Sequence, residues 1–139
     1  MENVVVFGII DDIPKQKGKI LLLHEKNKPA PALFKLPGGT VEEGEAVGRA
    51  LAREVEEETG LKVIACGDEF FKKNLKNHKL IAFRTQYVSG EIFPGDEIEK
   101  IELFSPEEVM LMLRHKKIVP THAEPLKKFL ELYYGLEVN

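Results

Sequence analysis

The amino-acid sequence predicts an α+β fold in which a mixed β-sheet is sandwiched between helices, an αβα arrangement. Short runs rich in β-branched residues dominate the first two thirds of the chain, and helical patterns lie between and after them. Glycine and proline separate these runs at short intervals. Because the 139 residues contain no internal repeat and no obvious linker, we expect a single domain over residues 1–139.

The first expected strand is the apolar run 4–10, which is typical of a buried strand. A turn region follows at 11–18, and residues 19–24 are predicted to form a second strand that pairs back on the first. The next expected strand includes a glycine, Gly67, near which it should break. The remaining strands are predicted over residues 61–71, 79–88 and 98–104.

Three helices are expected. The first covers residues 46–59 and ends at Gly60, a residue suited to the left-handed conformation that closes a helix. The second begins after Ser105, because the sequence Ser-Pro-Glu-Glu supplies a capping hydroxyl, a proline in the first turn and a glutamate at the third position. The last helix is expected to start at Thr121 or Glu124 and to end at Tyr134.

Composition excludes several classes of protein. The formal net charge of −3 argues against stable nucleic-acid binding, which needs a basic surface. The single cysteine, Cys66, cannot form an internal disulfide, and its apolar surroundings predict a place in the core. The apolar run near the N-terminus is too short to cross a membrane and lacks the flanks of a signal peptide. We therefore expect a cytoplasmic protein with no membrane partner.

The first helix carries an unusual acidic face. At about 100° per residue, Glu54, Glu57 and Glu58 all lie within about 80° of Val47, on the face that is apolar in the first half of the helix. Carboxylates three and four positions apart repel, and the C-terminal end of a helix disfavours anions. A solvated acidic helix end is the ordinary interpretation of such a pattern. Here, however, the acids continue the apolar face of the helix, and a Gly-Gly loop precedes the helix. These two features instead favour a site for Mg²⁺, for which Mn²⁺ could substitute.

The spacing of these residues resembles a known signature. Gly39 is followed after five residues by Glu45, and after seven more by the run Arg-Glu-Val-Glu-Glu-Glu-Thr-Gly-Leu, which ends at Leu61. This 23-residue stretch resembles the Nudix box of the Nudix hydrolases, the MutT-like family, with every defined position filled. The segments Leu-Pro-Gly-Gly before it and Asp-Glu-Ile at 96–98 are also similar to the family. The resemblance implies the Nudix fold and hydrolysis of nucleoside diphosphates linked to another group.

The resemblance also implies roles for individual residues. It assigns the metal to the carboxylates of Glu54, Glu57 and Glu58 and to the carbonyl of Gly39. Arg53 would orient the acidic cluster, and Glu45 would tie the loop to the helix. A metal-associated water would attack phosphorus, and Glu54, Glu57 and a residue outside the signature, Glu97, are all candidates for the general base.

The sequence leaves more than one substrate class possible. Markers typical of family members that cleave coenzyme A or NADH are absent, and neither proline nor tyrosine occurs between residues 61 and 82, where markers for ADP-ribose and dinucleoside polyphosphates would be sought. This favours nucleoside triphosphates, including oxidised ones, with ADP-ribose or another sugar nucleotide as the runner-up. A non-catalytic nucleotide-binding module is a rival that the complete signature disfavours. Family members often form homodimers.

For Phe34 and for the four histidines, the sequence favours ordinary structural roles. Phe34 precedes the Gly-Gly loop and could stack on a base, but core packing is the favoured role. The histidines have no metal-ligand spacing, so surface or loop positions are predicted for His24, His78, His115 and His122.

Overall fold

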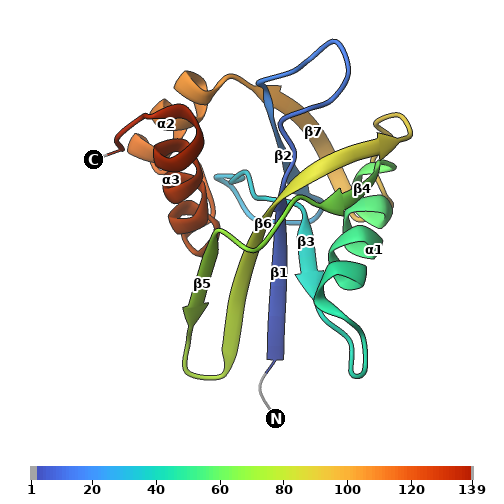
Figure 1. Ribbon diagram of the computed structural model, residues 1–139. Coiled ribbons are helices and arrows are strands. Elements are labelled where there is room, and N and C mark those ends of the chain that lie inside the picture. The colour runs from blue at the N-terminus through green and yellow to red at the C-terminus, as the bar shows by residue number, and fades with distance from the viewer. Residues whose placement is uncertain (1–2, 139) are drawn as a thin grey trace.

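The computed structural model describes residues 3–138, and its strands lie between one helix on one side and two helices on the other (Figure 1). The strands are β1 (Asn3–Ile9), β2 (Ile20–Glu25), β3 (Gly38–Thr40), β4 (Lys62–Ala65), β5 (Phe71–Asn74), β6 (His78–Ser89) and β7 (Ile98–Phe104). The helices are α1 (Val47–Thr59), α2 (Pro106–Arg114) and α3 (Pro120–Tyr134). Among the described residues, no helix is long and apolar enough to span a bilayer.

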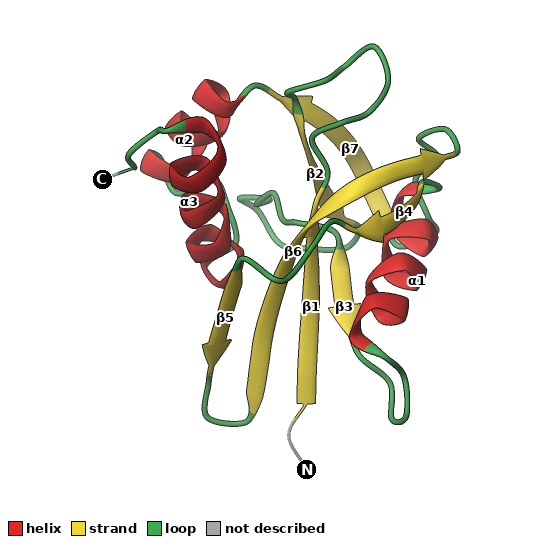
Figure 2. Ribbon diagram, viewed as in Figure 1, coloured by secondary structure: helices red, strands yellow, loops and turns green. Residues whose placement is uncertain are grey.

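The main sheet is mixed, as predicted. Its strands follow the order β3-β1-β6-β4, and β5 also pairs with β6 (Figure 2). The central pair β1 and β6 is parallel, and the other pairs are antiparallel. The expected strand 61–71 does break near Gly67, and its two parts form β4 and β5.

The predicted pairing of the second strand with the first is wrong. Strand β2 pairs with β7 in a separate antiparallel two-stranded sheet. The reason is that both edges of β1 are already occupied, by β3 on one side and by β6 on the other. Just after the end of β1, the Leu21 N–H still donates a backbone hydrogen bond to the Ile10 carbonyl at 3.1 Å.

The helix ends follow from local sequence. Helix α1 stops at Gly60, whose φ of 78° is left-handed and whose N–H donates to the Glu56 carbonyl at 2.9 Å. Helix α2 has the predicted capping box between Ser105 and Glu108. Helix α3 begins at Pro120, slightly before the predicted start. Cys66 is exposed, so its predicted core position is wrong: it follows the end of β4, where the alternation of buried residues has stopped.

Two apolar layers hold the helices against the strands. One lies under α1 and includes Leu51 and Val55, both fully buried. The other lies under α2 and α3 and includes Val109, Phe129 and Leu130, which are also fully buried. A helix on each side of the strands, each with its own core, confirms the predicted αβα sandwich.

Candidate active site

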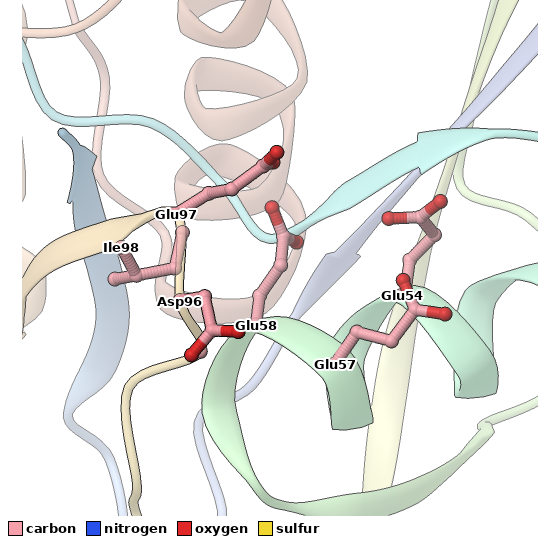
Figure 3. Close-up of a pocket in the computed structure, with 7 residues that line it drawn as sticks. Glu54, Glu57, Glu58, Asp96, Glu97 and Ile98 are labelled. Atoms are coloured by element: carbon pink, nitrogen blue, oxygen red, sulfur yellow. The ribbon is translucent and has the colours of Figure 1, made fainter. Parts of the chain in front are cut away.

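An acidic hollow of about 410 Å³ lies at the C-terminal half of α1. Figure 3 shows Glu54, Glu57 and Glu58 projecting from α1, while Asp96 and Glu97 come from the segment that leads into β7. We call this space the acidic hollow. The sequence predicted that the three helix carboxylates share a face and gave Glu97 as a further candidate. The fold brings Glu97 and its neighbour Asp96 to the same space, although they are about forty residues away in the chain.

The segment before β7 is fixed to the end of α1 by backbone hydrogen bonds. The Gly95 N–H donates to the Glu58 carbonyl at 3.0 Å, and the Phe93 N–H donates to the Thr59 carbonyl at 2.8 Å. These bonds satisfy carbonyls that a helix end leaves without intrahelical donors. The acids at 96 and 97 are thereby held opposite those of α1.

The two glycines of the loop allow backbone to approach the acids. Gly38 has a φ of 149°, and a Cβ atom there would lie 2.0 Å from the Val6 carbonyl oxygen. A Cβ atom on Gly39 would lie 2.5 Å from the carboxylate carbon of Glu54. Only glycine therefore lets β3 lie against β1 at Gly38, whereas a side chain at position 39 would displace the Glu54 carboxylate from its present contact.

Arg53 is the centre of an ion-pair network at the N-terminal side of the hollow. Its guanidinium donates to both carboxylate oxygens of Glu45, at 2.8 and 3.0 Å. The same group donates to Glu54 at 3.0 Å, to Glu57 at 3.4 Å and to the Thr40 carbonyl at 3.2 Å. One arginine therefore joins the loop, the start of the helix and two of the acids that line the hollow.

Glu58 lies in a different environment from Glu45. Its side chain is 14% exposed, and its carboxylate accepts the Gly38 N–H at 2.7 Å. The ammonium of Lys35 is 3.6 Å away. Burial raises the pKa of Glu58 to about 7, and burial likewise raises the pKa of Glu54. For both carboxylates, the surroundings therefore disfavour the charged form.

Glu57 and Glu97 are the open acids of the hollow. The side chain of Glu57 is 58% exposed. Glu97 is exposed as well, and its backbone is fixed because its carbonyl accepts the Lys26 N–H at 2.8 Å. Both line the acidic hollow, and both are accessible to water.

The donor set of the acidic hollow fits a hard divalent cation. Five carboxylates line one space, two of them are desolvated, and oxygen is the ligand type that Mg²⁺ and Mn²⁺ prefer. Within residues 3–138, no three acidic, histidine or cysteine side chains converge closely enough to enclose an ion. Arg53 and Lys35 instead form ion pairs with three of these carboxylates, those of Glu54, Glu57 and Glu58.

A second hollow, of about 310 Å³, adjoins the first and was not anticipated. We call it the proline-lined hollow. Its polar residues are Glu25, Lys28, Lys35 and His122, and its apolar residues are Pro29, Pro31, Leu33 and Val119. Lys35 joins the two hollows, because its ammonium lies 2.5 Å from Glu25 and 3.6 Å from Glu58.

His122 corrects a prediction. A surface or loop position was expected, but His122 is only 7% exposed and lies in the first turn of α3. Its ring packs on Phe7, and burial lowers its pKa to about 3. No spacing pattern in the sequence marks it, since its neighbours Leu36 and Phe7 come from distant segments. Phe34 packs against Phe104 at a centroid distance of 5.0 Å, in line with its predicted packing role.

Comparison with known proteins identifies the family. The family model described as "NUDIX domain" matches residues 2–129 of this chain. This chain belongs to the NUDIX family. An ADP-ribose pyrophosphatase from Methanocaldococcus jannaschii is 36% identical over 116 residues, which cover 79% of this chain and 69% of that protein. An NAD-capped RNA hydrolase, NudC, from Pseudomonas aeruginosa is 36% identical over 95 residues, and the match spans only 33% of its length.

Solved structures of NUDIX hydrolases show the same fold. A NUDIX hydrolase from Nitrosomonas europaea superposes with a TM-score of 0.79 at 24% identity, covering 98% of this chain and 74% of that one. An ADP-ribose pyrophosphatase from Streptococcus suis superposes with a TM-score of 0.71 at 25% identity, covering 94% and 91%. The Nudix protein described here is accordingly a pyrophosphohydrolase of the αβα Nudix fold.

Proposed function

We propose that this Nudix protein uses a divalent cation to hydrolyse the phosphoanhydride of a nucleoside diphosphate linked to a second group, with ADP-ribose as the leading substrate. The observation that carries this proposal is the pairing of the acidic hollow with the proline-lined hollow through Lys35. The first suits a metal-bound diphosphate, and the second suits the uncharged ring of a nucleoside.

In this proposal, the carboxylates of Glu54, Glu57 and Glu58 and the carbonyl of Gly39 hold Mg²⁺, for which Mn²⁺ can substitute. The ion supplies charge neutralisation at the phosphate oxygens and lowers the pKa of bound water. Arg53 holds Glu54 in place through the 3.0 Å hydrogen bond and ties it to Glu45. Glu58 is oriented by the Gly38 N–H, which leaves its second oxygen directed toward Lys35.

The general base is to be found among Glu54, Glu57 and Glu97. Glu57 and Glu97 are exposed to water, whereas Glu54 is partly buried and already accepts a hydrogen bond from Arg53. This difference favours Glu57 or Glu97 as the group that takes the proton from the attacking water. The pH–rate profiles of Glu54→Gln, Glu57→Gln and Glu97→Gln distinguish them, because only loss of the base removes the acidic limb.

ADP-ribose leads because the relative from Methanocaldococcus jannaschii, which carries that activity in its name, matches most of both chains. Nucleoside triphosphates, including oxidised ones, are the second candidate, favoured by the absence of proline and tyrosine between residues 61 and 82. The complete set of acids in the acidic hollow speaks against a non-catalytic binding module.

The test is hydrolysis of a substrate panel in ¹⁸O-labelled water with Mg²⁺. ADP-ribose should be cleaved fastest, and the label should appear on a phosphoryl product, because the proposed attack is at phosphorus. Glu58→Gln should cleave ADP-ribose at least about 10²-fold more slowly, while Glu56→Gln, a change at the exposed neighbouring glutamate, should retain the parent rate. Label only on a sugar hydroxyl, or no cleavage of any anhydride in the panel, would contradict the proposal.

A further inference from the structure

We propose that His122 determines specificity by donating a hydrogen bond from Nε2–H to a ring nitrogen of the adenine that occupies the proline-lined hollow. The inference rests on the proposed function, because it assigns this hollow to the nucleoside end of the same substrate. It starts from an imidazole that is more than nine-tenths buried yet lines the hollow.

The tautomer of His122 follows from its contact with the backbone. The Leu36 N–H donates to Nδ1 of His122 at 3.0 Å, so Nδ1 must be the acceptor and carries no proton. In a neutral imidazole the proton then resides on Nε2. Burial lowers the pKa of the ring to about 3, so the ring is neutral near pH 7. His122 therefore presents one donor and no further acceptor.

The position of the ring is also fixed. His122 packs on Phe7 with a centroid distance of 4.0 Å and an interplanar angle of 31°. Among the described residues, the side-chain hydrogen bond of His122 runs through Nδ1, and Nε2 has no partner. The one buried side-chain polar atom there that lacks a partner belongs to Asp12, so Nε2 of His122 is not fully buried. Since its residue lines the proline-lined hollow, the donor is open to a ligand there.

The other walls suit a flat heteroaromatic ring. Pro29, Pro31, Leu33 and Val119 provide apolar surfaces, and the volume of about 310 Å³ lies at the lower end of the range for small-molecule sites. Glu25 adds a carboxylate acceptor, and a hydrogen bond from Lys35 lowers the pKa of Glu25, which keeps it ionised. A ligand that fits must therefore combine an acceptor for His122 with a donor for Glu25.

Adenine meets both requirements, because its exocyclic amino group lies next to a ring nitrogen on each of two edges. A guanine presents a keto oxygen in place of that amino group, and this oxygen would face the carboxylate of Glu25. Lys35 lies between the hollow and Glu58, so an adenosine bound here directs its phosphates toward the acidic hollow. The pairing of donor and acceptor thus selects an adenine nucleotide.

Two substitutions at His122 separate recognition from structure. His122→Asn keeps an oxygen near the position of Nδ1, so it can still accept the Leu36 N–H, but it removes the Nε2 donor. His122→Gln places an amide donor near Nε2 and loses the acceptor. His115→Asn, at an exposed histidine that ends α2, is the matched control.

The probe is AMP, which contains no anhydride, titrated calorimetrically in Mg²⁺ buffer together with its 1-deaza and 7-deaza analogues. His122→Asn should weaken AMP binding about 3- to 10-fold, the range of one neutral hydrogen bond. One of the two deaza analogues should bind the parent protein more weakly than AMP does, by the same factor. The affinity of that analogue should not fall further in His122→Asn. His122→Gln should melt at a lower temperature yet still distinguish AMP from that analogue.

Unchanged AMP affinity in His122→Asn, or an equal loss for AMP and both analogues, would overturn the inference. Because AMP is not hydrolysed, this result is independent of catalysis. ADP-ribose hydrolysis that persists while the AMP test fails would refute the role of His122 and leave the proposed function standing. His115→Asn should bind AMP as the parent does.

Discussion

Two carboxylates of the same 23-residue motif have opposite electrostatic environments. Glu45, near the start of α1, receives two hydrogen bonds from Arg53, and these lower its pKa to about 2. Glu58, in the last turn of α1, is buried, and burial raises its pKa to about 7. The charged form of Glu45, near the start of the helix, is therefore stabilised by its surroundings, while the charged form of Glu58, at the other end, is disfavoured.

This contrast separates a structural part of the motif from a functional part. The Glu45–Arg53 pair orders the loop and points Glu54 into the acidic hollow without needing a ligand. Glu58 is near a helix C-terminus and close to Glu54, so two unfavourable influences act on it in addition to burial. A group kept in such a state is typical of a site that is completed by binding.

Metal removal should give the largest effect. If Glu58 and Glu54 need a cation, activity with Mg²⁺ should vanish in EDTA and return when excess Mg²⁺ or Mn²⁺ is added. The measurement is the rate of phosphoanhydride hydrolysis before chelation, after it and after restoration. Full turnover in EDTA would mean that the contrast between the environments of Glu45 and Glu58 is unrelated to catalysis.

Glu58→Gln should lower turnover by about 10² or more, an estimate based on the loss of a metal ligand and its charge stabilisation. Gln keeps the shape of the side chain and can still accept the Gly38 N–H, so the change isolates the charge. Steady-state kinetics at saturating Mg²⁺ measures the effect, with Glu56→Gln as the control. A rate within a few-fold of the parent would place Glu58 outside the catalytic site.

Glu45→Gln should have a smaller effect, about tenfold on kcat/KM, because it acts through Arg53 rather than at the reacting atoms. Loss of one charge from the bidentate pair leaves Arg53 free to shift toward Glu54 and Glu57 and to compete with the cation. Mg²⁺ titrations of activity should show a higher half-saturating concentration. Glu43→Gln, at a neighbouring exposed position, should leave that concentration unchanged.

The sequence predicted the acidic face well because it depends on local geometry alone. A helix of known period fixes the directions of Glu54, Glu57 and Glu58 relative to Val47, and Gly60 marks the end of that helix. The αβα sandwich likewise follows from patterns that each segment carries.

What depends on distant segments was not predictable. Strand β2 pairs with β7 because both edges of β1 are occupied. The residue pattern within β2 does not indicate which strand is its partner. His122 meets Leu36 across 86 positions of the chain, so its burial could not be inferred from its neighbours. Lys35 lies just before the Gly-Gly loop in the sequence, so a position near the acids could be predicted, but its contact with Glu25 arises only in the fold.

The smallest expected effect is on stability, and it tests the comparison most directly. The pKa of Glu58 is raised from 4.5 to about 7 in the folded protein, so folding favours its protonated form. The stabilisation associated with Glu58 is therefore fully present below pH 4.5 and is lost as the pH rises through 7. In the metal-free protein, Glu58→Gln should increase the free energy of unfolding at pH 8 by roughly 0.5–2 kcal/mol and change it little at pH 4.5.

Thermal melts of the parent and of Glu58→Gln in EDTA, at both pH values, measure this difference. Adding Mg²⁺ at pH 8 should raise the melting temperature of the parent more than that of the variant, because a ligand stabilises only the state that binds it. Marked destabilisation of Glu58→Gln in EDTA at pH 8 would instead mean that the charge of Glu58 supports the fold through Lys35. Glu58 would then resemble Glu45, and the division of the motif into a structural and a functional end would fail at this residue.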